Sequence, residues 1–168
     1  MKNQKTCKEV TNKLNLEDLL SKNPKEPGTP PEGFENYPPF RMPTMEEVTQ
    51  ISRKYNCPFP PSFIKYQTDL GKYIADPEGL GWASPEVPAY MSLESIIKGA
   101  CECEWEPDRW LVPFAEDEGN FYCFDTRFPD SEGEFPVVFW DHDEANVLNV
   151  DHLKWQNFAH WLKRYYEN

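Results

Sequence analysis

The tetrapeptide Asp141-His142-Asp143-Glu144 concentrates carboxylate and imidazole groups, which are ligand types that divalent metals bind in proteins. An EF-hand is excluded, because a loop starting at Asp141 has Asn146 where glycine is needed and His152 where the bidentate glutamate belongs. A transition-metal or Mg²⁺ site would need further ligands from elsewhere, such as Asp117 or Asp125. We therefore interpret the tetrapeptide as a hairpin turn with solvated acids, and we assign no metal.

Cysteine and histidine offer two other kinds of chemistry. Cys101 and Cys103 would make half of a zinc site, but the sequence has no second close pair, which favours structural thiols. A Cys123–His142 dyad would be nucleophilic, yet Cys123 falls inside an apolar run, where burial raises the pKa of a thiol and makes it inert. No phosphate-binding glycine loop or other catalytic motif is found. We expect no catalytic residues and no cofactor.

The distribution of acidic residues is the most informative feature. The chain has 17 Lys+Arg and 29 Asp+Glu, a net charge of −12, and residues 94–151 hold 16 of the acids with 3 basic residues. Such a region attracts a basic partner and opposes nucleic-acid binding; the alternative is a solvated surface that keeps the protein soluble. The candidate partner-binding residues are the acids of this region and one aromatic anchor: Glu102, Glu104, Trp105, Glu106, Asp108, Glu116, Asp117, Glu118, Asp141, Asp143 and Glu144.

These residues need a folded domain to position them. The length of 168 residues, with 39% hydrophobic and 15% aromatic residues, is sufficient for one compact core. Seven prolines between Pro24 and Pro43 predict an extended connector, so we divide the chain into a basic segment with a Pro-rich connector at 1–43 and a domain at 44–168. Residues 1–23 form either a docked helix or a loose tail. No apolar run is long enough to cross a membrane and no signal peptide precedes the domain, so we expect a cytosolic protein.

Local signals predict helices on both sides of a sheet. Thr44 with Glu47 forms a capping box for a helix over 45–55. Prolines open a helix over 61–70, and Ser92 precedes a short helix. A last helix is expected to start at Asp151 and to dock on the sheet.

Four aromatic and β-branched runs, at 110–114, 121–124, 137–140 and 147–150, predict an antiparallel meander. The second and third runs are continuously apolar, so helices must cover both faces. The strict alternation over 101–106 predicts an edge strand. The expected fold class is α+β, with an antiparallel β-sheet meander covered by N-terminal and C-terminal helices.

Several motifs follow one another in a specific order: Pro60-Pro61-Ser62-Phe63-Ile64, Leu111-Val112-Pro113-Phe114-Ala115, Glu118 to Asp125, Pro136 to Asp143, and Trp155 to Leu162. Over residues 44–166 this series resembles the SUKH superfamily, which includes a fungal cell-wall synthesis regulator of the Smi/Knr type. The resemblance implies an α+β domain without catalysis. In bacteria it implies an immunity protein that binds and neutralises a cognate toxin, such as a nuclease or deaminase. The alternatives are a regulatory or scaffold module and, last, a hydrolase with a carboxylate site.

Overall fold

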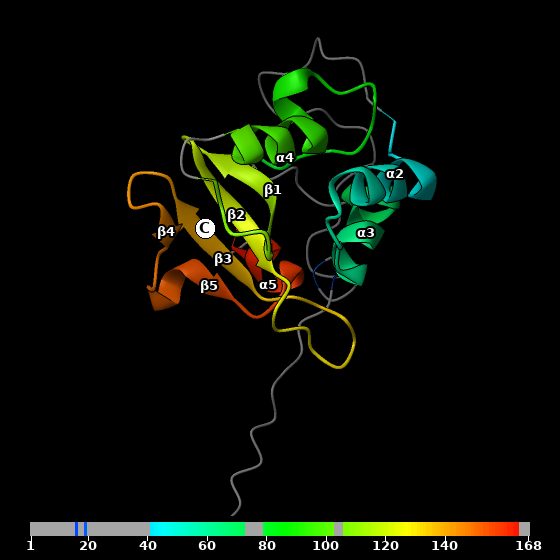
Figure 1. Cartoon of the computed structure of the whole chain (residues 1–168). Helices are drawn as coiled ribbons and strands as arrows, with labels where there is room; N and C mark the ends of the chain where they lie inside the picture. Colours follow the sequence, from blue (N-terminus) through cyan, green and yellow to red (C-terminus); the bar gives the residue numbers. More distant parts are fainter. Residues whose placement is uncertain (1–15, 17–18, 20–40, 73–78, 103–105, 165–168) are drawn as a thin grey trace, which may run out of the picture.

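The apolar runs form an antiparallel sheet in the computed structural model, which describes residues 16, 19, 41–72, 79–102 and 106–164 (Figure 1). The sheet has five strands: β1 (Leu111–Asp117), β2 (Asn120–Asp125), β3 (Val137–Asp141), β4 (Asn146–Val147) and β5 (Lys154–Trp155). Strands β1 to β4 are neighbours in chain order, which confirms the meander. The fifth strand, β5, was not expected; it pairs with β3 beside β4.

The helices begin at signals that are local in the sequence. Thr44 Oγ1 accepts a hydrogen bond from the backbone N–H of Glu47, whose carboxylate accepts one from the N–H of Thr44, so the capping box is confirmed. The second helix starts at Pro61 as expected but ends at Thr68, because the chain continues as a 3₁₀ turn. The helices are α2 (Met45–Tyr55), α3 (Pro61–Thr68), α4 (Leu93–Glu102) and α5 (Phe158–Lys163), with 3₁₀ turns at Leu70–Lys72, Ala89–Met91 and Asp151–Leu153.

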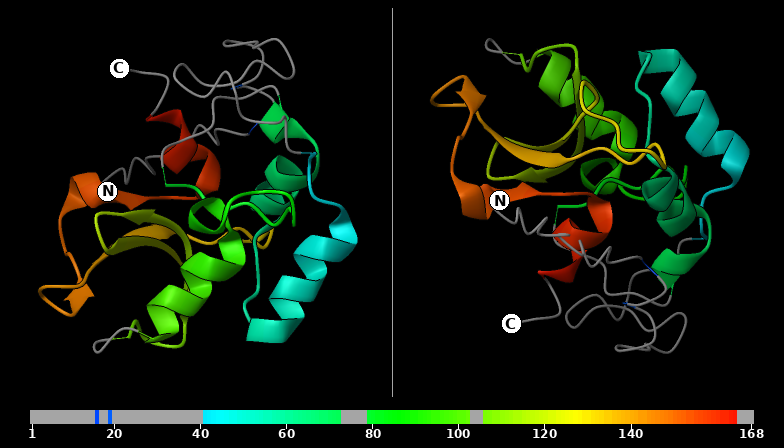
Figure 2. Two further views of the ribbon diagram at one scale, coloured as in Figure 1. Left: turned by 90° about the horizontal axis from the view of Figure 1, so that it is seen from above. Right: turned by 90° about the horizontal axis from the view of Figure 1, so that it is seen from below.

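Side chains of β2 alternate between two apolar clusters, as an extended strand requires. Phe121 and Cys123 belong to a small cluster that includes residues of α4. Tyr122 and Phe124 belong to the main core on the other face. Figure 2 shows α4 and α5 on opposite sides of the sheet. Both faces of the central strands are therefore covered, as the sequence predicts.

Aromatic rings fill the main core between the sheet and helices α3 and α5. The ring centroid of Phe63 lies 5.7 Å from that of Phe114, 5.3 Å from that of Phe124 and 5.2 Å from that of Phe158. Phe114 and Phe124 stack at 4.2 Å across β1 and β2, and Trp161 reaches Phe114 at 4.9 Å. Large rings bury much apolar area and prefer such tilted or offset contacts, so this cluster fixes the helices on the sheet.

Three predictions about local structure differ from the observed fold. Asp151 does not cap the last helix: it starts a 3₁₀ turn, Trp155 lies in β5, and Asn157 caps α5 by accepting a hydrogen bond from His160 N–H at 3.0 Å. Strand β4 pairs with Trp140 and Asp141 only, so the backbone groups of Val137 and Val138 need another partner. Strand β5 pairs with them, and the last helix therefore starts later in the sequence. The edge strand predicted over 101–106 fails at Cys101 and Glu102, which extend α4. The last expected strand is also shorter, ending at Val147.

Gln67 is a buried polar residue that completes an irregular segment next to β1. Its Nε2 donates a hydrogen bond to the carbonyl of Gly81 (2.8 Å), and its Oε1 accepts one from the N–H of Ala83 (2.9 Å). The same segment also donates from Gly81 N–H to the carbonyl of Phe114 at 2.9 Å, and Leu80 bridges Ala115. The Gln67 side-chain amide therefore satisfies two buried backbone groups that no strand pairs.

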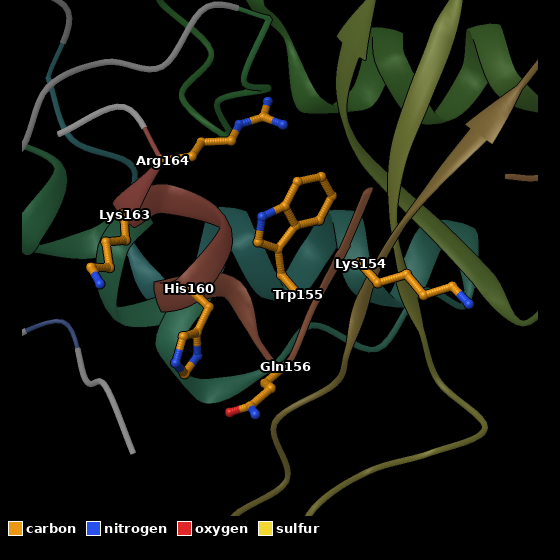
Figure 3. A pocket seen from close by; sticks show the side chains of 6 residues that line it. All are labelled: Lys154, Trp155, Gln156, His160, Lys163 and Arg164. Carbon is orange, nitrogen blue, oxygen red and sulfur yellow. The ribbon is translucent and has the colours of Figure 1, made fainter. Parts of the chain in front are cut away.

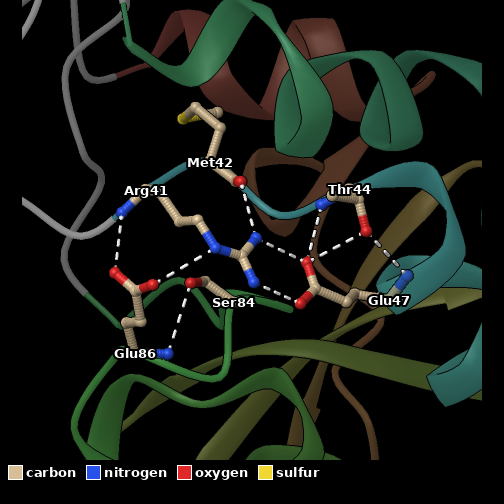
Figure 4. Close-up of polar contacts among 6 residues, drawn as sticks. All are labelled: Arg41, Met42, Thr44, Glu47, Ser84 and Glu86. Carbon is tan, nitrogen blue, oxygen red and sulfur yellow. Dashed lines mark hydrogen bonds and ion pairs between the residues drawn. The ribbon is translucent and has the colours of Figure 1, made fainter.

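Two described parts of the N-terminal region contact the domain. Leu16 and Leu19 are helical and buried in the main core, at 2% and 3% exposure. Arg41 forms a bidentate pair with Glu47, at 2.8 and 2.5 Å, and its Nε lies 3.2 Å from Glu86 (Figure 4). The hydrogen bond from Arg41 lowers the pKa of Glu47 from 4.5 to about 2, so this carboxyl stabilises the fold above pH 4.5 and loses that effect as the pH falls toward 2.

No helix in the described part of the chain is both long enough and apolar enough to cross a bilayer.

Candidate functional site

Two turns lie side by side at one end of the sheet. The β1–β2 turn contains Glu118 and Gly119, both with positive φ, and the β3–β4 turn follows Asp141. Asn120 joins the turns: its Oδ1 accepts a hydrogen bond from His142 N–H at 3.0 Å and lies 2.8 Å from His142 Nδ1. Asp141 Oδ1 accepts hydrogen bonds from the N–H of Asp143 at 2.9 Å and of Glu144 at 3.1 Å. The turns are therefore held together by side chains on the strands.

Six carboxylates lie on these two turns or on the strand ends beside them, in a set that we call the acidic turn surface: Glu116, Asp117, Glu118, Asp141, Asp143 and Glu144. Asp117 accepts a hydrogen bond from the hydroxyl of Tyr122 at 3.2 Å. Among the described residues, the basic group within 4.0 Å of these carboxylates is His142, whose Nε2 lies 3.1 Å from Asp143. The Asp143 side chain is 84% exposed. The surface therefore carries negative charge that the domain itself largely leaves uncompensated.

The other candidate residues do not join this surface as one cluster. Glu102 ends α4, 3.6 Å from Lys98 of the preceding turn. Glu106 and Asp108 are exposed in the segment before β1, and the carbonyl of Asp108 accepts from Leu111 N–H at 2.7 Å. That places Asp108 at the start of β1, about 20 Å from the strand's other end for a strand of this length. Glu104 and Trp105 lie outside the described residues.

Three acids of the same region are used inside the domain. Glu94 accepts hydrogen bonds from Lys54 and from the hydroxyl of Tyr55, and the Lys54 bond is the main reason that the pKa of Glu94 is lowered. Asp125 is buried and binds Arg127 through both oxygens. Glu134 accepts from the N–H and hydroxyl of Ser62 at the start of α3. These carboxylates stabilise the fold and are separate from the acidic turn surface.

The geometry does not support the Cys123–His142 dyad. Cys123 is fully buried, which raises the pKa of its thiol, and its sulfur lies 3.9 Å from the carbonyl oxygen of Phe121. His142 instead contacts Asn120 and Asp143. Burial also raises the pKa of Cys57, to about 11. Within the described ranges, no group of three or more His, Cys, Asp or Glu side chains is placed to hold a metal ion.

A basic hollow of about 310 Å³ lies where β5 meets α5 (Figure 3). It is lined by Lys154, Trp155, Gln156, His160, Lys163 and Arg164. The Arg164 guanidinium lies 4.1 Å from the ring centroid of Tyr122 and 4.7 Å from that of Trp161, so it is part of the aromatic packing. The sequence analysis missed this hollow, because it placed these residues on one long helix starting at Asp151.

Residues 17–167 match the family model SUKH_5, described as SMI1-KNR4 cell-wall. The chain belongs to the SMI1-KNR4 family. The match confirms the resemblance seen in the sequence, and it starts well before residue 44, close to the buried Leu16 and Leu19.

A solved structure supports the fold of this SMI1-KNR4 chain. The crystal structure of a protein from Pseudomonas syringae pv. tomato superposes with a TM-score of 0.62 at 18% sequence identity. The match covers 89% of this chain and 96% of that one. No curated protein matches the sequence. The fold and the family are therefore established, and the family includes toxin-immunity proteins.

Proposed function

We propose that this SMI1-KNR4 domain is an immunity protein that binds a basic toxin in the cytosol and neutralises it without catalysis. One observation carries the proposal: the six carboxylates of the acidic turn surface lie on two linked turns and the strand ends that adjoin them, with His142 as their basic neighbour among the described residues. Membership of a family that includes toxin-immunity proteins supports it.

The proposed mechanism is stoichiometric occlusion. Carboxylates on the turns pair with the Lys or Arg side chains that the toxin uses to hold its own substrate, and charge-assisted hydrogen bonds of this kind are strong when they are desolvated. The negative field of the domain also steers a basic partner toward the surface and raises the association rate. Because Asn120 and Asp141 fix the turns before binding, less conformational entropy is lost in the complex.

Charge reversal on the turns tests this function. The double variant Glu118→Lys/Glu144→Lys changes two exposed side chains, while the hydrogen bonds of the turns come from Asn120 and Asp141. The product of the neighbouring gene is the candidate toxin to test. If it stops growth when produced alone, wild type should restore growth and bind it one to one, whereas the variant should lose protection and bind it at least tenfold more weakly.

A matched control has the same change in net charge elsewhere. Glu46→Lys/Asp151→Lys alters two exposed acids away from the turns and should protect as wild type does. Full protection by Glu118→Lys/Glu144→Lys would contradict the proposal, as would equal losses in both double variants.

The family description as a cell-wall family favours a second candidate, a regulatory or scaffold module that binds a cellular protein. The two functions differ in the partner. An immunity protein binds a polypeptide that stops growth when produced alone, whereas the partner of a scaffold module leaves growth unchanged.

A further inference from the structure

Phe128 is a large apolar side chain that the domain exposes. Its relative exposure is 62%, and it lies in the connection between β2 and β3. This connection, residues 126–136, lies at the end of the sheet opposite the β3–β4 turn (Figure 1). An exposed phenylalanine contributes little to folding. Single apolar residues are common on protein surfaces, so it is the way the Phe128 ring is held, and the charge around it, that make it a candidate for binding.

The ring of Phe128 is held by its neighbours. The guanidinium of Arg127 lies 5.1 Å from the Phe128 ring centroid and 5.0 Å from that of Trp110. Arg127 is itself fixed by Asp125, with Nε donating at 2.9 Å and Nη2 at 2.7 Å to the two carboxylate oxygens. The Asp125 carboxylate is buried. Trp110, Arg127 and Phe128 therefore form an ordered stack, which we call the aromatic stack.

The loop that carries the stack is fixed as well. Asp130 Oδ1 accepts hydrogen bonds from the N–H of Glu132 at 2.8 Å and of Glu134 at 3.0 Å. Glu134 in turn binds the first turn of α3 through Ser62. A side chain that is ordered before binding loses less entropy in a complex, and residues that dominate interfaces are enriched in Trp and Arg.

Several acidic residues lie on the segments that carry the aromatic stack. Asp108 lies near enough to Arg127 to contribute, after the larger effect of Asp125, to the raised pKa of its guanidinium. Asp130 and Glu132 are exposed on the same loop, and Glu106 precedes Asp108 in the exposed segment before β1. An apolar centre with an acidic rim is complementary to a basic protein surface that offers an apolar pocket.

We propose that the aromatic stack is a second protein-binding surface, at the end of the sheet opposite the acidic turn surface, and that Phe128 anchors the basic partner there. This inference rests on the proposed function for the nature of the partner. It assigns the role of aromatic anchor to Phe128, whereas the sequence analysis placed that role on Trp105.

The test uses the full chain and a matched aromatic control. Tyr90 has the same exposure, 62%, and lies in the 3₁₀ turn Ala89–Met91. Benzoylphenylalanine is placed at position 128 or at position 90 in the cell that makes this protein, and cross-linking should yield a basic protein from position 128 but not from position 90. The purified partner is then titrated by calorimetry against wild type, Phe128→Ala, Phe128→Tyr and Tyr90→Ala.

Phe128→Ala should raise the Kd at least tenfold, while Phe128→Tyr, which keeps the ring, and Tyr90→Ala should change it less than threefold. The melting temperature should be the same in all four proteins, because both side chains are exposed. Should Phe128→Ala lower the melting temperature, the position-specific adduct and the retained affinity of Phe128→Tyr decide the question.

Every other outcome has a defined meaning. No adduct specific to position 128, an acidic protein or a nucleic acid in the adduct, or an unchanged Kd for Phe128→Ala would overturn the inference. A basic partner that depends on Phe128 but does not stop growth would leave the surface standing and remove the immunity function. A toxin that binds Phe128→Ala normally but does not bind Glu118→Lys/Glu144→Lys would overturn the role of Phe128 and leave the immunity function standing.

Discussion

Glu134 shows how one carboxyl in an acidic chain acquires a structural role. It accepts two hydrogen bonds from Ser62, yet burial raises its pKa, with Asp130 and Glu132 adding repulsion. Glu134 and Ser62 are 72 residues apart in the chain, so sequence alone gave no means to separate Glu134 from the solvated acids around it. The same holds for Glu94, whose partner Lys54 lies 40 residues away. Acidic regions could be predicted, but individual roles could not.

Glu134→Gln should stabilise the protein at neutral pH. The amide can still accept from Ser62 N–H and can donate to the hydroxyl, without the cost of a buried charge. Because the folded-state pKa is raised, the folded protein binds more protons than the unfolded chain between the two pKa values, and wild type loses stability as the pH rises through that window.

The difference in unfolding free energy between Glu134→Gln and wild type, measured in urea, should therefore be largest near pH 7 and shrink below pH about 4.5, the ordinary pKa of a glutamate. Glu144→Gln, the same substitution at an exposed position, is the control. A Glu134→Gln protein less stable than wild type at pH 7 would mean that these hydrogen bonds need a full charge.

At the scale of elements, the sequence predicts best where the signals are local. The capping box at Thr44 and the prolines before α3 act within one turn, and both helices start where expected. Strand β5 has two residues and no periodicity of its own. It exists because β3 offers an unpaired edge at Val137 and Val138, which is a tertiary cause. The misplaced start of the last helix follows from the same cause.

Gln67 is an element-scale feature, since one side chain connects α3 to the segment beside β1. Gln67→Leu would leave the carbonyl of Gly81 and the N–H of Ala83 buried without these partners. We expect a loss of about 2–5 kcal/mol in unfolding free energy, from two unsatisfied buried groups. Gln50→Leu, at an exposed position of α2, should change it by less than about 0.5 kcal/mol. Equal stability of Gln67→Leu and wild type would show that water replaces the amide.

On the scale of the whole molecule, whose net charge is −12, two groups of exposed acids lie at opposite ends of the sheet. The acidic turn surface lies at one end, and the aromatic stack with its acidic neighbours lies at the other. Charge concentration could be predicted from the sequence, because it depends on counts alone. The placement of the acids at two ends of the sheet could not be predicted, because it depends on which strand ends lie next to each other.

Salt dependence tests the steering role of this charge. The association rate constant with the basic toxin should fall about tenfold or more between 0.05 and 0.5 M NaCl, since exposed charges are screened over a Debye length that shortens to a few ångströms. The dissociation rate should change much less. Stopped-flow measurement should show a flatter salt dependence for Glu118→Lys/Glu144→Lys, and a wild-type association rate that ignores salt would contradict electrostatic steering.

The pairing at the borders of the sheet has a further consequence. On one border, β3 is paired along its length by β4, by Leu148 and by β5. On the other, Gly79 and Gly81 bond to β1, and Pro113 has no N–H to offer. Strand addition by an incoming peptide, and the stacking that leads to fibrils, are thereby disfavoured in the described sheet. Recognition is left to side chains, so evolution can retarget the molecule by surface substitution while its scaffold stays constant.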